Sequence, residues 1–151
     1  MVHRASGNWK RPGDSEEHVA GPRIGPTWAE ALAHPGAEQC AIGAVFLRSL
    51  LWWRLEPAPE RAQLDPAPAE LWQRPACAVA AGSTWVAYLP RATGRMVLKG
   101  IEPLAWIARW LDPRTGATHD AGSVVVSPSH KWRAPEAPSE EDWVLVLTVD
   151  G

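Results

Sequence analysis

The sequence predicts a mainly β fold, an antiparallel β-sandwich that follows one short and one longer α-helix. Three observations support this prediction. From residue 76 onward, apolar side chains recur with the period of two that is typical of strands. Turn sequences such as Asp112-Pro-Arg-Thr-Gly116 separate these stretches at the close spacing found in sandwiches. Over residues 36–51 the apolar period is instead that of a helix.

The N-terminal part of the chain contains the start of the first helix. Residues 1–26 are rich in Gly, Pro and charged side chains without any apolar period, which predicts loop or disorder. Thr27 and Glu30 then form a capping-box pattern, in which each side chain accepts a hydrogen bond from the other residue's amide. A short helix from Trp28 to about Ala33 is expected to follow.

The second helix, over residues 36–51, is apolar around most of its circumference. Its few polar side chains fall on one narrow face, so more than one neighbouring element is needed to cover the rest. We therefore expect Phe46 and Leu50 to be partly exposed. The segment Ile42–Leu51 is then a candidate surface for self-association.

Residues 56–75 contain five prolines and are predicted to form an extended linker without a share in the core. In the sandwich domain, residues 76–151, the turn at Asp112–Gly116 has the chemistry of a type I turn followed by a left-handed glycine. Residues 143–149 are apolar on both faces, which predicts a strand in the middle of a sheet. The predicted strands are 76–81, 84–89, 95–99, 106–111, 123–126, 131–134 and 143–149.

Charge and hydropathy exclude several classes of partner. The net charge is −2 and no Lys/Arg cluster occurs, so a nucleic-acid partner is not expected. The first ten residues lack the apolar region of a signal peptide, and no apolar run is long enough to span a membrane. As written, the sequence therefore predicts a cytoplasmic chain without a membrane association.

No motif for catalysis, metal or cofactor binding occurs. The thiols of Cys40 and Cys77 supply too few ligands for a zinc site; two lone buried thiols are favoured, with one disulfide bridge as the alternative. The five histidines are scattered, and no Gly-x-Ser-x-Gly elbow exists. The acidic run at 140–142 is interpreted as a solvated turn, so no catalytic residue and no cofactor are predicted.

The ten tryptophans admit two interpretations. As a ligand platform, Trp85, Trp106, Trp110 and Trp132 would stack on sugar rings or on an extended protein chain. As core, five buried indoles would remove roughly 1,000 Å² from water and contribute on the order of 25 kcal/mol, which favours burial for most of them. Trp132, between two cationic residues, is the best candidate for an exposed ring. The candidate ligand-binding residues are Trp85, Tyr88, Trp110, Arg114 and Trp132.

Several phrases, taken in order, resemble the C-terminal region of the apiosidase-like glycoside hydrolases. This region includes a small β-domain labelled the collagen-binding domain of a collagenase. The resemblance extends over roughly residues 27–149, and the Leu-Asp-Pro-Arg-Thr-Gly turn and the last strand are its most specific parts. The phrases are Trp28–Leu32, Pro35–Gln39, Leu51–Leu55, Trp85–Pro90, Ala108–Gly116 and Asp142–Leu147.

The resemblance implies that this sequence corresponds to an accessory region and lacks the catalytic domain of the family. Residues 27–55 would be the remnant of the last helix of a (β/α)8 barrel with its connection, and a whole barrel needs about 250 residues. The family's catalytic carboxylates lie in that barrel, so no residue here inherits their role. The implied function is a non-catalytic accessory domain, a fragment of a longer enzyme, whose partners are the parent barrel and polysaccharide or matrix protein. The alternative is a free-standing carbohydrate-binding or adhesion module that uses exposed Trp.

Overall fold

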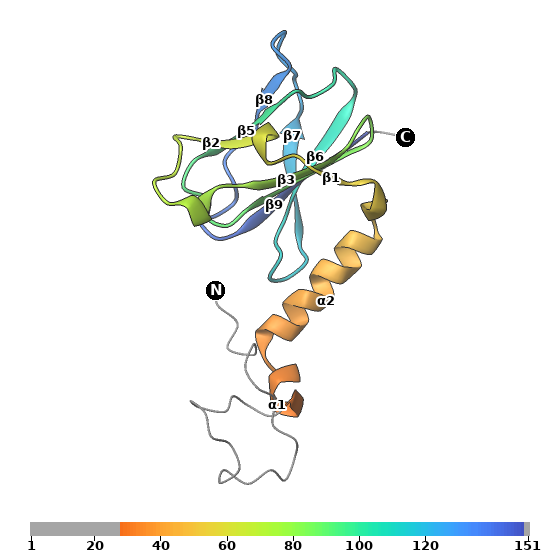
Figure 1. The fold of residues 1–151 in the computed structure, drawn as a ribbon, viewed down its shortest axis with the longest axis vertical. Helices are drawn as coiled ribbons and strands as arrows, with labels where there is room; N and C mark the ends of the chain where they lie inside the picture. Colours follow the sequence, from red (N-terminus) through yellow and green to blue (C-terminus); the bar gives the residue numbers. More distant parts are fainter. Residues whose placement is uncertain (1–27, 150–151) are drawn as a thin grey trace.

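The computed structural model describes residues 28–149, and in Figure 1 two helices lead into a β-domain. The helices are α1 (Trp28–Leu32) and α2 (Pro35–Arg48), followed by the 3₁₀ helix η2 (Trp52–Arg54). The predicted loop at 1–26 and the Thr27 half of the capping box lie outside the described residues.

Over residues 56–149, nine strands and two further 3₁₀ helices make up the β-domain. The 3₁₀ helices are η3 (Pro59–Arg61) and η4 (Leu71–Gln73). The strands are β1 (Glu56–Pro57), β2 (Ala62–Asp65), β3 (Ala76–Ala80), β4 (Thr84–Leu89), β5 (Arg95–Lys99), β6 (Trp106–Leu111), β7 (Thr118–Ser123), β8 (Lys131–Arg133) and β9 (Trp143–Val149).

The strands form two antiparallel sheets that enclose the core. The larger sheet has the order β1-β3-β4-β9-β6-β7, and the smaller has the order β2-β5-β8. One hydrophobic cluster joins the sheets, because it contains Met96 and Leu98 of the smaller sheet together with Trp85 and Leu147 of the larger one. The predicted mainly β, antiparallel sandwich is thereby confirmed.

β9 lies between β4 and β6, which confirms the central position predicted for the last strand. Leu145 and Leu147 are fully buried toward the core. The alternate residues Val146 and Thr148 lie on the other face of the sheet, where α2 covers part of it. Two apolar faces are what a strand in this position requires.

The linker predicted at residues 56–75 is corrected by the structure. β1 extends the larger sheet by pairing with β3, and β2 forms an edge of the smaller sheet by pairing with β5. Ala58, Ala62 and Leu64 belong to the hydrophobic core. Proline is tolerated at sheet edges, where one side of a strand needs no ladder hydrogen bonds, so the proline content did not exclude strands here.

The strand predicted at 123–126 was wrong in its position: the structure has β7 (Thr118–Ser123) just before it. β7 is an edge strand in which only Ala121 is buried, so its polar sequence shows no apolar alternation. The prediction rested on the apolar residues 124–126 that follow β7, yet Val125 is 76% exposed. Edge strands with one solvated side are difficult to recognise from hydropathy alone.

Helix α2 covers the larger sheet with only one of its faces. Phe46 and Leu50 are half-buried, as predicted, and line a cavity of about 190 Å³ together with Ile107 and Val146 of the sheet. None of the residues of α2 is fully buried. In Figure 1 the helix runs away from the sandwich, with α1 at its far end.

Candidate functional site

Three of the predicted ligand-binding residues are buried in the structure. Trp85, Trp110 and Trp132 are 0%, 2% and 5% exposed, so their rings have no face to offer a ligand; Trp106 is buried as well. The expectation that Trp132 is exposed was wrong. Its neighbours Lys131 and Arg133 are exposed because side chains alternate along β8, and that alternation turns the ring between them into the core.

Three other tryptophans of the described part of the chain are exposed. Trp52 and Trp53 follow α2, and Trp72 lies in η4, with exposed fractions of 53%, 65% and 60%. Sequence analysis did not single them out as ligand-binding residues. These three residues lie outside the segments in which apolar side chains alternate. In an alternating strand, the pairing register determines whether a Trp faces the core, and no such register applies to these three.

The remaining two predicted residues, Tyr88 and Arg114, are brought to one place. Tyr88 is near the end of β4, and Arg114 is in the turn between β6 and β7. Asp142 immediately precedes β9, which pairs with both β4 and β6. The sheet topology thereby places three side chains from distant parts of the sequence within reach of one another.

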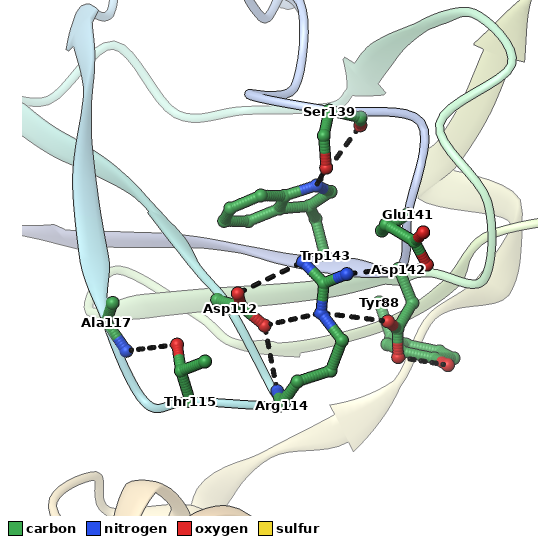
Figure 2. A network of polar contacts seen from close by, with 9 residues as sticks. All are labelled: Tyr88, Asp112, Arg114, Thr115, Ala117, Ser139, Glu141, Asp142 and Trp143. Atoms are coloured by element: carbon green, nitrogen blue, oxygen red, sulfur yellow. Dashed lines mark hydrogen bonds and ion pairs between the residues drawn. The ribbon is translucent and has the colours of Figure 1, made fainter.

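Arg114 is the centre of a network of ion pairs (Figure 2). Its Nε and Nη2 donate to the two carboxylate oxygens of Asp112 at 2.8 and 3.0 Å. Its Nη1 lies 3.3 Å from Glu141 Oε2, and its Nε lies 3.7 Å from Asp142 Oδ1. The guanidinium also lies 5.7 Å from the centre of the Trp143 ring, a cation–π geometry.

The network shifts the pKa values of Asp112 and Tyr88. The hydrogen bond from Arg114 holds the pKa of the Asp112 carboxyl below its usual range, although partial burial opposes this shift. Burial, followed by the charge of Asp142, raises the pKa of Tyr88. The phenol therefore stays protonated at neutral pH and donates to Asp142 Oδ2 at 3.3 Å. Asp142 is thus held from two sides, by a phenol and by a guanidinium.

Beside this network lies an open pocket of about 400 Å³, which we call the Tyr88 groove. η4, the end of β4, the turn after β6 and the acidic run before β9 all contribute to its walls, and Gln39 of α2 borders it. It combines two aromatic rings with two guanidinium groups and three carboxylates. These lining residues are Trp72, Tyr88, Arg91, Arg114, Glu140, Glu141 and Asp142.

Replacing Asp112 by Asn is expected to lower the free energy of unfolding by about 1–2 kcal/mol at pH 7, because the charge-assisted pair with Arg114 is lost. A carboxyl with a lowered pKa stabilises the fold above about pH 4 and loses that contribution as the pH falls through its folded-state pKa. Urea unfolding at pH 7 and pH 3 measures both effects. The difference between wild type and variant should shrink at pH 3; a difference that is equal at both values would contradict the assignment.

Neither thiol forms a disulfide. Cys77 is buried as predicted, and burial raises the pKa of its thiol to about 11. Cys40 is exposed on α2, so the prediction of two buried thiols was wrong for this residue. The sheet covers only one face of α2, and helical period alone does not determine which face that is.

Neither a cluster of metal ligands nor a membrane-spanning helix occurs between residues 28 and 149. No group of three or more His, Cys, Asp or Glu side chains in this range is arranged to hold a metal ion. The helices of the same range are all too short or too polar to cross a bilayer.

Comparison with known proteins gives a family match for the β-domain. Residues 74–148 match the model of the family described as "Putative collagen-binding domain of a collagenase". The matched segment contains all strands from β3 to β8 and nearly all of β9. No curated protein sequence matched the chain.

Two solved structures with a similar fold carry the name glycoside hydrolase in their titles. One, titled "Glycoside hydrolase", superposes with a TM-score of 0.69 at 16% identity, over 94% of this chain and 31% of that chain. A second, a glycoside hydrolase family 5 protein from Bacteroides vulgatus ATCC 8482, gives 0.66 at 16% identity, over 82% and 26%. The chain spans about a third or less of either protein. Residues 74–148 thus match the collagen-binding-domain family, in a fold that recurs within much longer glycoside hydrolase chains.

Proposed function

We propose that this chain is a non-catalytic C-terminal accessory domain of an apiosidase-like glycoside hydrolase, and that it packs on the catalytic domain through α2 and η2. The observation that carries the proposal is an apolar surface, which we call the docking strip. It consists of Val45, Leu47, Leu51, Trp52 and Trp53, which are between 43% and 65% exposed.

A strip of this kind is unusual on a protein that stands alone. Five large apolar side chains are exposed within nine consecutive residues, whereas the sandwich buries most of its own. Contiguous apolar surface on a soluble domain usually marks an interface. Leu47 and Leu51 are four residues apart, about one helical turn, and the exposed Trp52 and Trp53 of the 3₁₀ turn follow Leu51 directly.

The comparisons support a catalytic domain as the partner. Residues 56–149 make up less than two thirds of the chain, so a structural match over 94% of it includes the helices as well. The glycoside hydrolase in that match has more than two thirds of its length outside the aligned part. A helix that lies on the β-domain with one face and is apolar on the other is suited to join two such bodies.

Static light scattering over a range of concentrations tests the docking strip. Without its partner, the purified chain is expected to self-associate, and the double variant Leu47→Ser/Leu51→Ser is expected to stay monomeric because its apolar edge is broken. Leu71→Ser is the matched control, since Leu71 is 71% exposed but lies in η4. It should associate like wild type.

Two results would contradict the proposal. A wild-type chain that remains monomeric at high concentration would show that the strip needs no partner. Turnover of aryl glycosides by the pure protein, abolished by a single Asp or Glu substitution, would show that the domain is catalytic in its own right.

A further inference from the structure

We infer that the Tyr88 groove is a binding site for a neutral saccharide of one or two sugar rings. This inference goes beyond the proposed docking function, because none of the docking-strip residues lines the groove; α2 contributes only Gln39 to its border. It assigns the accessory domain a ligand of its own.

The size of the groove favours a small ligand. Its volume of about 400 Å³ falls within the range of pockets that take small molecules. An extended protein chain requires a longer surface with repeated contacts along a strand edge or an aromatic track. One local pocket with two aromatic rings is better matched to one or two sugar rings.

The aromatic side chains supply an apolar platform. Trp72 is 60% exposed and Tyr88 38% exposed, whereas most of the tryptophans in the β-domain are buried. A sugar ring has an apolar C–H face that packs on an indole or phenol, and large rigid rings provide contact area at little entropic cost. Trp72 gains nothing for the core in this position, so its exposed ring is available to a ligand.

The polar side chains supply acceptors for hydroxyl groups. Asp142 is fixed by Tyr88 at 3.3 Å and faces Arg114 at 3.7 Å, so its carboxylate is already oriented before a ligand arrives. Glu141 is more exposed and has a single ion pair in the network, with its Oε2 3.3 Å from Arg114 Nη1. Preoriented carboxylates accept strong hydrogen bonds from neighbouring hydroxyls of a sugar, with little loss of side-chain entropy on binding.

The charge balance favours a neutral sugar over an anionic one. The two guanidinium groups that line the groove both have carboxylate partners: Arg114 has Asp112, Glu141 and Asp142, and Arg91 lies 4.0 Å from Glu140. Three carboxylates against two guanidinium groups leave the lining negative. A uronic acid would meet repulsion there without an unpaired guanidinium in the lining to bind it.

Affinity electrophoresis of the whole chain tests the inference, in native gels that contain galactomannan, xyloglucan or arabinoxylan as neutral probes. A gel with polygalacturonate is the anionic probe, and a pull-down with collagen is the protein probe. We expect retardation by at least one neutral polysaccharide. Trp72→Ala should weaken this binding by about tenfold or more, as truncation of a central aromatic anchor does.

The controls separate binding from folding and from docking. Val125→Ala removes an exposed apolar side chain outside both the groove and the docking strip and should bind like wild type, and Trp72→Tyr, which keeps a ring, should retain most of the affinity. Trp72→Ala should still self-associate in light scattering. A loss of saccharide binding at the groove can therefore be distinguished from a loss of association through the docking strip. Retardation by polygalacturonate alone, capture by collagen alone, no retardation in any gel, or full binding by Trp72→Ala would each overturn the inference.

Discussion

Trp85→Ala is expected to lower the free energy of unfolding by about 3–5 kcal/mol, the cost typical of truncating a large buried aromatic side chain. The ring is 0% exposed at the centre of the core, and Arg61 lies 5.4 Å from its centre in a cation–π geometry. Truncation leaves a cavity between the two sheets that the surrounding strands can close only in part. Since small domains are stable by about 5–15 kcal/mol, a large share of the total would be lost.

Chemical denaturation followed by circular dichroism measures this loss, with Trp53→Ala as the control. Trp53 is 65% exposed, so its removal should change the unfolding free energy by no more than about 0.5 kcal/mol. Trp85→Phe should cost less than Trp85→Ala. The Trp85 indole N–H is buried without an acceptor among the described residues, and Phe removes that unpaired donor while filling most of the space. A loss under about 1 kcal/mol for Trp85→Ala would contradict the core assignment.

Gly116→Val is expected to destabilise the chain by about 1–3 kcal/mol, because Gly116 closes the β6–β7 turn at φ +77°. A β-branched residue rarely adopts this left-handed conformation. The left-handed conformation also accompanies the hydrogen bond that closes the turn, in which the Gly116 amide donates to the Asp112 carbonyl at 2.8 Å. A Cβ at this position would lie 3.4 Å from Ile42 Cγ2 of α2, an ordinary van der Waals contact, so the expected cost comes from the backbone conformation.

Urea unfolding of Gly116→Val and of Gly43→Ala tests this explanation. Gly43 lies in α2, where the space that a Cβ would occupy has no neighbouring atom within 4 Å, and alanine is the better helix former by about 1 kcal/mol. The control should therefore be neutral or stabilising. An unchanged midpoint for Gly116→Val would show that the turn tolerates an ordinary backbone conformation at this residue.

Hydropathy and turn chemistry were sufficient for most of the sandwich. Six of the seven predicted strands correspond to β3, β4, β5, β6, β8 and β9 to within a residue at either end. The left-handed glycine at 116 and the central position of β9 were also predicted correctly. These features depend on local sequence, since a period of two or an Asp-Pro-x-x-Gly turn is complete within a few residues.

The candidate site was only partly predictable. Tyr88 and Arg114 were named from the sequence and do lie at the groove, while Trp72 was not named. A lone Trp between proline-rich segments carries no period, so its sequence does not indicate on which side of the molecule its ring lies. The ion pairs around Arg114 join residues 112, 114, 141 and 142, and no local pattern indicates that these two segments meet.

The sequence by itself therefore determined the fold class, the order of most strands and the turn that carries Arg114, because each of these follows from short-range periodicity or backbone chemistry. Only the tertiary structure decided which rings are buried and which are exposed. Trp132 is buried because β8 pairs with β5 over the core, and Trp72 is exposed because η4 lies outside both sheets and contributes no side chain to the core. Burial depends on what packs against a side chain, and those contacts come from strands far away in the sequence.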